Sequence, residues 1–357
     1  MGGKPKAPGG RQLSEAICSL WTISHQLWLV LAYAKSVKCQ WISEFFISYY
    51  SLLFCVIPII MIVVYNNHTF KIIFAGVPIL MAERKMIPIL KWAGGKTQLL
   101  TNINARMPDT YNRYFEPFIG GGAVLFSIAP THAYINDINQ QLINLYHQLQ
   151  IRSSEVIKFV NELDAISCDK ERFYSIRERY NEKITEGIFD AECAALMIWI
   201  NKHCFNGLYR VNGKGLFNVP YNNKVAGKSI DEENVYSIST YLQQSNTVIS
   251  CVDFEPFCEN VQANDFVYFD SPYVPESDTA NFTDYTKDGF TLADHERLAA
   301  LFRRLDKRGA KLLLSNNDVP LVHSLYQGYN IQSVDVKRMI NRNASKRFGR
   351  EVLITNY

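Results

Sequence analysis

Residues 266–273 read Phe-Val-Tyr-Phe-Asp-Ser-Pro-Tyr, an apolar run followed by a carboxylate, a turn dipeptide and an aromatic ring. A short apolar run bounded by turn residues is typical of a strand buried on both faces of a parallel sheet. Open α/β sheets place their chemistry at the carboxyl ends of such strands. Asp270, Ser271, Pro272 and Tyr273 therefore stand where such a sheet would carry its functional groups.

This turn has the chemistry to hold a planar base that bears an exocyclic amine. A carboxylate and two successive backbone carbonyls can accept its two N–H groups, while the aromatic ring stacks on the face of the base. Asp-Ser-Pro is also an ordinary turn sequence, so the tetrapeptide alone leaves a purely structural turn open.

A glycine-rich turn ends an earlier strand-like run. Residues 115–122 read FEPFIGGG, and consecutive glycines let the backbone turn sharply and approach a bound cofactor closely. The spacing differs from the dinucleotide fingerprint Gly-x-Gly-x-x-Gly. Asp137 ends the next strand-like run, at the place where an acidic side chain commonly holds ribose hydroxyls.

A set of motifs in order resembles the Dam family of DNA adenine N6-methyltransferases. The motifs are KWAGGK at 91–96, EPFIGGG at 116–122, ND at 136–137, NGLYR at 206–210, FNVP at 217–220 and DSPY at 270–273. The resemblance covers roughly residues 86–357. The family usually carries proline where this chain has Ser271. Because the chemistry uses the carbonyl of that residue, the departure bears on loop rigidity more than on activity.

The resemblance implies a site-specific enzyme that transfers a methyl group from S-adenosyl-L-methionine to N6 of an adenine flipped out of double-stranded DNA, with GATC as the expected site. The amine of adenine is a poor nucleophile, so transfer depends on positioning. Asp270 is assigned the side-chain acceptor role, the Ser271 carbonyl the backbone acceptor role and Tyr273 the stacking role. Pro272 completes the catalytic turn.

Two other readings stay open. A similar turn serves any planar amine or amide, so the substrate could be an RNA amine or a protein amide. A non-catalytic DNA-binding or membrane-tethered protein would be expected to lack Asp270 or the glycine turn, and both are intact.

The resemblance also implies which residues hold the cofactor. Trp92 can cover an adenine ring, Lys96 can meet the methionine carboxylate and Asp137 can hold ribose. The full implied set is Trp92, Lys96, Glu116, Phe118, Gly120, Gly122, Asp137 and Asp270.

DNA contacts are implied in the segment 205–220 and beside it. Arg210 can form a bidentate pair with guanine O6 and N7. Phe205 can fill the space left by a flipped base, or it can be a core residue at the end of an apolar helix. The implied set is Lys91, Phe205, Asn206, Leu208, Arg210 and Pro220, and a purely structural hairpin is the alternative for this segment.

Composition sets broad limits. With 357 residues, of which 48% are hydrophobic and 20% charged, the chain can bury a large core. The net charge of +3 does not by itself imply nucleic acid, but basic residues crowd positions 337–350. The eight cysteines and seven histidines show no metal-ligand spacing, so no metal site is predicted. A reducing cytoplasm and a cognate restriction endonuclease acting on the same site are the expected setting.

Apolar strand-like runs and helical patterns alternate along the chain, which favours an α/β fold with helices on both faces of a mostly parallel sheet. Strands are predicted at 113–119, 132–136, 247–252, 266–270, 310–315, 329–335 and 350–356. Helices are predicted at 97–106, 138–150, 156–163, 171–180, 190–205, 292–307 and 319–326. The resemblance implies a Rossmann-like S-adenosylmethionine-dependent methyltransferase sheet with an inserted helical DNA-recognition subdomain.

Three regions are predicted. Residues 86–150 and 246–357 form the methyltransferase catalytic domain, and residues 151–245 form the helical target-recognition subdomain. Residues 1–85 are a hydrophobic N-terminal extension. Its uncharged run 45–65 is long enough for a membrane span, but Pro58 interrupts it. A dispensable or spurious extension, with translation beginning at Met81 or Met86, is favoured over a membrane anchor.

Overall fold

The computed structural model of the chain describes residues 59–66, 69–76, 86–224, 227–275, 289–337 and 348–357. Contacts between residues divide the chain into two compact units, Met1–Glu83 and Arg84–Tyr357.

The first unit contains a two-stranded antiparallel sheet. Strand β1 (Ile59–Asn66) pairs with β2 (Thr69–Gly76), and Asn66 lies opposite Thr69. Residues 59–65 of the apolar run thus lie in a strand and not in a helix, whereas residues 45–58 lie outside the described residues. Within the described ranges, no helix is long and apolar enough to cross a membrane.

The second unit is built on a seven-stranded sheet in the order β5-β4-β3-β6-β7-β9-β8. Its strands are β3 (Tyr114–Glu116), β4 (Ala133–Asn136), β5 (Val248–Ser250), β6 (Phe266–Phe269), β7 (Lys311–Asn317), β8 (Asn330–Lys337) and β9 (Phe348–Thr355). The five strands from β5 to β7 are parallel to one another. Strand β9 runs antiparallel to both of its neighbours. The predicted α/β class with a mostly parallel sheet is confirmed.

The order of the strands places a topological switch point between β3 and β6. From β3 the chain moves outward to β4 and β5, whereas from β6 it moves in the other direction to β7. Ligands of open α/β sheets bind outside the carboxyl ends of the strands at such a point. The glycine turn leaves β3 and the Asp-Ser-Pro-Tyr turn leaves β6, so both predicted motifs meet there.

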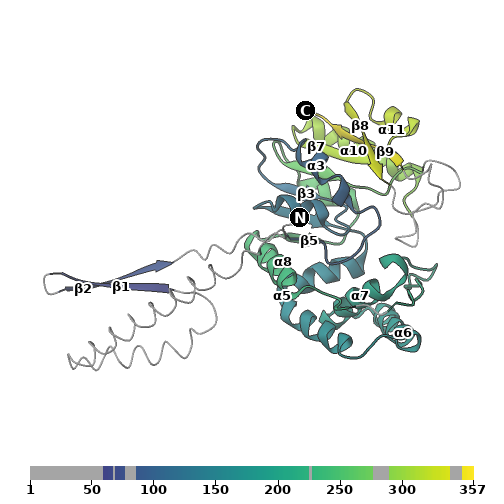
Figure 1. The fold of residues 1–357 in the computed structure, drawn as a ribbon. Coiled ribbons are helices and arrows are strands. Elements are labelled where there is room, and N and C mark those ends of the chain that lie inside the picture. Colours follow the sequence, from purple (N-terminus) through teal and green to yellow (C-terminus); the bar gives the residue numbers. More distant parts are fainter. Residues whose placement is uncertain (1–58, 67–68, 77–85, 225–226, 276–288, 338–347) are drawn as a thin grey trace, which may run out of the picture. The chain divides into compact units, whose positions relative to one another are not determined.

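Helices cover both faces of the sheet. They are α3 (Leu100–Asn104), α4 (Ala123–Ile128), α5 (Gln140–Asp164), α6 (Lys170–Glu186), α7 (Ala191–His203), α8 (Glu232–Gln244), α9 (Phe254–Phe257), α10 (Leu292–Lys307) and α11 (Pro320–Leu325). Short 3-10 turns occur at η1 (Lys96–Gln98), η2 (Phe205–Gly207) and η3 (Cys258–Asn260). Helices α5 to α8 gather at one end of this unit, away from β7, β8 and β9 (Figure 1).

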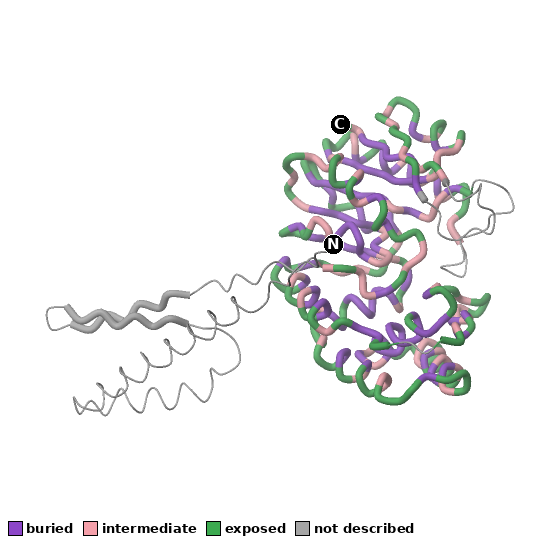
Figure 2. Tube along the Cα trace, viewed as in Figure 1, coloured by how far each residue is buried: buried purple, intermediate pink, exposed green. Residues whose placement is uncertain are grey.

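Strand β6 shows how the sheet separates two hydrophobic cores. Phe266 and Tyr268 pack into the core that includes helices α5, α7 and α8. Val267 and Phe269 point to the opposite face, into the core that includes α10 and α11. All four side chains are fully buried, and buried segments run through the sheet (Figure 2). Burial on both faces explains why this strand reads as a continuous apolar run.

The helical middle differs in detail from the prediction. The predicted helices at 138–150 and 156–163 form one helix, α5, with a kink at Arg152 where φ is −141° and ψ is 35°. The predicted boundary between residues 150 and 151 falls beside this kink. Helix α8 was not among the predicted helices, although its Asp231 accepts a hydrogen bond from Asn234 N and so caps its first turn.

The second unit is expected to fold without the residues that precede Met86. Asn234, which is 4% exposed, accepts a hydrogen bond from Ile87 N at 3.0 Å and donates one to Ile87 O at 2.9 Å. A truncated chain beginning at Met86 keeps both bonds. It should therefore unfold cooperatively in urea, which circular dichroism would measure.

A chain shortened further, to begin at Ile89, provides the comparison. It leaves the buried amide of Asn234 without these partners, which should cost about 1–3 kcal/mol of unfolding free energy. Failure of the Met86 chain to fold would show that this unit depends on the first.

Candidate active site

The turn after β6 is held by a buried ion pair. The ammonium of Lys96 lies 2.8 Å from Oδ1 of Asp270, and Ser315 Oγ donates to the same oxygen at 3.1 Å. Lys96 is only 5% exposed. Burial raises the pKa of Asp270, and the ammonium of Lys96 opposes this shift. Lys96, predicted to meet a cofactor carboxylate, is therefore also the counter-ion of Asp270.

The ring of Tyr273 is fixed from two directions. Lys96 Nζ lies 4.6 Å from the ring centroid, and the Tyr273 hydroxyl donates to Oε2 of Glu351 at 2.7 Å. Burial and the carboxylates of Asp270 and Glu351 raise the pKa of Tyr273 well above its ordinary value. The phenol therefore stays protonated and acts as the donor to Glu351.

Strand β7 holds the end of the same turn. Val274 N donates to Asn316 Oδ1 at 3.0 Å, and Asn317 Nδ2 donates to Val274 O at 2.7 Å. The polar run at 315–317 begins at the last residue of the predicted strand 310–315 and was the available sequence signal for these contacts. Ser271 is 2% exposed, and its hydroxyl has no hydrogen-bond partner in the described part of the chain.

The glycine turn after β3 requires glycine at position 120. Its φ is +47°, and a Cβ atom there would lie 3.0 Å from Cδ1 of Trp92. Gly120 N donates to Oδ2 of Asp137 at 3.2 Å, while Asn139 N donates to Oδ1 at 3.0 Å. Burial raises the pKa of Asp137 to about 6, and the two backbone donors oppose the shift. Asp137 thus orders the glycine turn.

Two further predicted cofactor residues line the start of this turn. Glu116 is 2% exposed and accepts a hydrogen bond from the Tyr114 hydroxyl at 2.7 Å. Burial raises the pKa of Glu116 well above its usual range, and the hydrogen bond from Tyr114 opposes this shift. Phe118 packs against Phe254 and Phe290, with ring centroids 5.5 and 5.9 Å away. Gly122, where φ is +74°, precedes helix α4.

The loops at this edge of the sheet are tied together by Asn136. Its Nδ2 donates to the carbonyls of Pro117 and Val252, at 3.0 and 2.9 Å, and its Oδ1 accepts from Val252 N at 3.0 Å. Asn136 is 1% exposed. One amide therefore fixes the loops that follow β3, β4 and β5 relative to one another.

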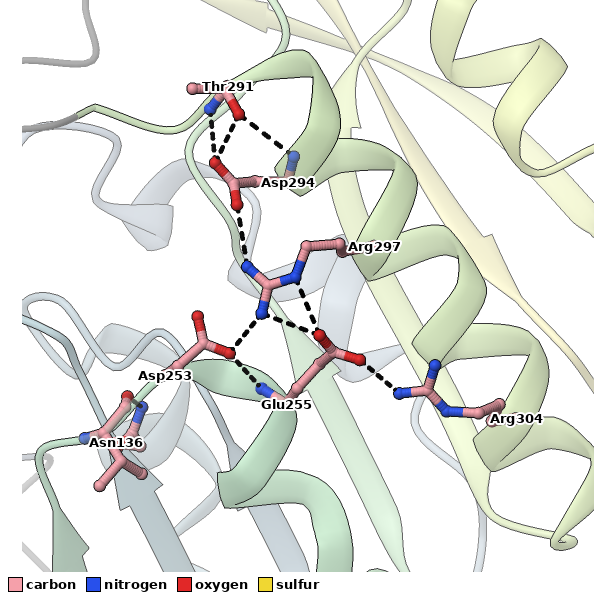
Figure 3. Close-up of polar contacts among 8 residues, drawn as sticks. Asn136, Asp253, Glu255, Thr291, Asp294, Arg297 and Arg304 are labelled. Atoms are coloured by element: carbon pink, nitrogen blue, oxygen red, sulfur yellow. Dashed lines mark hydrogen bonds and ion pairs between the residues drawn. The ribbon is translucent and has the colours of Figure 1, made fainter.

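Arg297 of α10 braces the loop after β5 (Figure 3). Its guanidinium bonds Asp253 at 2.7 Å, Glu255 at 2.9 Å and Asp294 at 2.9 Å. Hydrogen bonding to Asp253 is the largest cause that raises the pKa of Arg297. Sequence reasoning missed this cluster, because nothing in the local pattern of α10 indicates which carboxylates Arg297 meets.

The KWAGGK loop is clamped to the predicted DNA-binding segment. Asn201 of α7, which is 4% exposed, accepts from Lys91 N at 2.9 Å and donates to Lys91 O at 3.0 Å. The same side chain donates to Gly207 O at 2.9 Å. The ring of Trp92 stacks on Tyr209, with centroids 5.1 Å apart. The predicted cofactor and DNA residues therefore form one connected site.

The predicted DNA-binding side chains lie mostly at the surface. Phe205 is 51% exposed and follows the end of α7, so it is not a core residue. Its backbone N–H donates to Pro220 O at 2.8 Å. Arg210 is exposed, and its Nε donates to Asn218 Oδ1 at 2.8 Å. Lys91 and Asn206 are exposed and Leu208 is half-buried.

Two other expectations concern charge and metal. Most of the basic residues noted at 337–350 fall within 338–347, which lie outside the described residues. Across the described ranges, no group of three His, Cys, Asp or Glu side chains is arranged to hold a metal ion.

The mostly parallel seven-stranded sheet is that of a Rossmann-like methyltransferase fold. The family model described as "D12 class N6 adenine-specific DNA methyltransferase" matches residues 92–340. The chain belongs to this family and is an adenine-specific DNA methyltransferase.

Several curated proteins resemble the chain along most of their own length. Type II methyltransferase M1.LlaDCHI of Lactococcus lactis subsp. cremoris is 41% identical over 76% of this chain and 95% of that protein. Type II methyltransferase M.MjaIII of Methanocaldococcus jannaschii is 42% identical over 76% of this chain and 99% of that protein. The DNA adenine methylase of Serratia marcescens is 34% identical over 73% and 94%.

The Lys96–Asp270 pair should control the pH dependence of turnover. Lys96→Met removes the ammonium that opposes the effect of burial, so Asp270 should protonate at a higher pH. The acidic limb of the profile of kcat against pH should move upward by about 1–3 units at saturating methyl donor.

Lys158→Met is the matched control, because Lys158 of α5 is 71% exposed. It should leave the profile unchanged. An unshifted profile in Lys96→Met would mean that the ionisation of Asp270 does not limit turnover.

Proposed function

We propose that the enzyme transfers a methyl group from S-adenosyl-L-methionine to N6 of adenine within GATC in double-stranded DNA. The observation that supports this proposal is the contact between the KWAGGK motif and the Asp-Ser-Pro-Tyr turn at the switch point of the sheet. Lys96 of the KWAGGK motif pairs with Asp270 at 2.8 Å, so the proposed cofactor motif meets the proposed catalytic turn.

Asp270 and the Ser271 carbonyl are the proposed acceptors for the two N–H groups of the adenine amine. Hydrogen bonds accepted from both N–H groups localise the nitrogen lone pair away from the ring and toward the methyl group. Tyr273 offers its ring for stacking. Lys96 lies over one face of this ring at 4.6 Å, so the opposite face is the one proposed for the base. The base must leave the helix at a cost of about a few kcal/mol, which these contacts offset.

The residues around the glycine turn fit a cationic cofactor with a ribose and a planar base. Glu116, Asp137 and Asp270 bring acidic groups to this edge of the sheet, and Gly120 and Gly122 keep the turn free of side chains. Trp92 and Phe118 offer aromatic surface, and Lys96 can meet a carboxylate. S-adenosyl-L-methionine, when bound, supplies an activated methyl group.

Target recognition is assigned to the exposed residues of the 205–220 segment and to Lys91. Arg210 would read a guanine edge, Phe205 would fill the space left by the flipped adenine, and Leu208 and Pro220 are suited to a thymine methyl group. Asn206, in the left-handed conformation with φ of +57°, turns the backbone between α7 and Arg210. Residues 151–245 are the proposed recognition subdomain, carried by a catalytic domain of residues 86–150 and 246–357.

The cellular setting is part of the same proposal. Two of the similar proteins are named type II methyltransferases, which supports a companion restriction endonuclease that cuts the same site. The enzyme would act in the cytoplasm, and residues 1–85 would be dispensable. The family match begins at residue 92, which supports the last point.

Asp270→Ala tests the catalytic assignment. It should abolish most methylation of a GATC duplex at saturating S-adenosyl-L-methionine, because it removes one of the two acceptors. Duplex affinity should change little, since phosphate contacts elsewhere supply most of it. Asp335→Ala, whose carboxylate is 87% exposed on β8, is the control and should retain turnover. Near-normal turnover in Asp270→Ala would place the catalytic turn elsewhere.

Arg210→Ala tests the assignment of base readout. Discrimination against one altered base pair of GATC should fall by about 1–3 kcal/mol, measured as kcat/KM over duplexes with single base-pair changes. Arg308→Ala, an exposed arginine that follows the C-terminal end of α10, should leave the ranking of duplexes unchanged. A uniform loss over all duplexes in Arg210→Ala would identify Arg210 as a phosphate contact.

A further inference from the structure

Glu351 occupies an unusual place for a carboxylate. It lies in β9, where it pairs with Asn317 of β7 on one side and with Val334 of β8 on the other. The residues that follow it in the strand, Val352 and Leu353, are fully buried. Glutamate is depleted in strands, so the contacts of its side chain bear on its role at this position.

The hydrogen-bond partner of Glu351 supplies a reason for a carboxylate at this position. Oε2 of Glu351 accepts a hydrogen bond of 2.7 Å from the hydroxyl of Tyr273, which is 78 residues away in the sequence. A hydrogen bond to an ionised carboxylate is shorter and stronger than one between neutral groups. Tyr273 belongs to the turn that also carries Asp270.

The bond fixes the position of the hydroxyl end of the Tyr273 ring. The phenol oxygen lies on the axis of the second side-chain torsion, so the bond restrains the first torsion directly. It favours one rotation of the ring only through the preference of the O–H group for the ring plane. Lys96 Nζ, 4.6 Å from the centroid, restrains one face. With its tip and one face held, the ring presents its other face in a single orientation. A base that stacks there arrives in a defined plane relative to Asp270.

We propose that Glu351 is a positioning residue for methyl transfer, which holds the hydroxyl end of Tyr273 so that its ring, with Lys96 on one face, stays in place for the target adenine to stack on. The inference rests on the proposed function, in which Tyr273 stacks on the flipped base. Glu351 itself touches neither the base nor the reacting atoms in this assignment, and acts through the hydroxyl of Tyr273.

The test removes the same hydrogen bond from either side, in the full-length protein. Tyr273→Phe deletes the hydroxyl and keeps the ring, whereas Glu351→Leu deletes the acceptor. Each should lower single-turnover methylation by about tenfold at saturating S-adenosyl-L-methionine and GATC duplex. The double variant should lose no more than either single variant, because both changes break one bond. Glu351→Gln, whose amide oxygen can still accept, should recover most of the rate.

A second readout follows the base itself. A duplex with 2-aminopurine at the target position fluoresces when this base leaves the helix and is quenched when it stacks on an aromatic ring. Tyr273→Phe and Glu351→Leu should both raise the fluorescence of the complex above that of the unaltered enzyme. A role of Glu351 in folding alone would not reproduce this change in Tyr273→Phe.

Tyr273→Ala separates failure of the inference from failure of the proposed function. If it retains turnover and leaves the fluorescence unchanged, Tyr273 does not stack on the base and the proposed site is wrong. If it loses turnover while Tyr273→Phe matches the unaltered enzyme in both rate and fluorescence, only the role of Glu351 is overturned. Multiplying losses in the double variant would overturn it as well. Tyr273→Phe keeps the test decisive if Glu351→Leu does not fold.

Discussion

The ion pair between Lys96 and Asp270 joins the two halves of the site. Lys96 opens η1, close to the start of the second unit, and Asp270 follows β6, yet their charged atoms lie 2.8 Å apart. Breaking a buried pair leaves an uncompensated charge, which costs more than the pair contributes. The pair therefore links the position of the KWAGGK loop to the ionisation of Asp270. Burial raises the pKa of this carboxylate, and Lys96 and the hydroxyl of Ser315 both oppose the shift.

A second constraint ties the KWAGGK loop to the segment that leads to Arg210. Asn201 bonds both the N–H and the carbonyl of Lys91 and also the carbonyl of Gly207. Gly207 cannot carry a side chain, because a Cβ atom would lie 2.6 Å from Cδ of Lys91. With Trp92 stacked on Tyr209, the segment that leads to Arg210 moves only if the KWAGGK loop moves with it.

Much of the fold and of the candidate site could be predicted from the sequence. The rest could not, because it depends on contacts between residues that are far apart in the sequence. The strand 266–269 was predictable because burial on both faces leaves an uninterrupted apolar run. The motifs at Asp270 and Gly120 were predictable because turns need particular residues. The hydrogen bond between Tyr273 and Glu351 could not be predicted, since the two residues are 78 positions apart in the sequence and pairing across a sheet leaves no local pattern. The sequence left open whether Phe205 is a core residue or a surface residue, because the apolar helix before it ends only two residues earlier.

Strand β9 has a consequence for how the protein is made. In chain order it follows every other strand of the sheet, yet it takes an interior position between β7 and β8. Chains emerge from the ribosome N-terminal end first. The edges of β7 and β8 that pair with β9 therefore stay unpaired until β9 has been synthesised. Unpaired edges are templates for association with other chains. Because Glu351 lies on β9, a nascent chain cannot brace Tyr273 until this strand has been inserted. Assembly of the turn after β6 therefore follows the insertion of β9, and until then the open edges of β7 and β8 can pair with other chains.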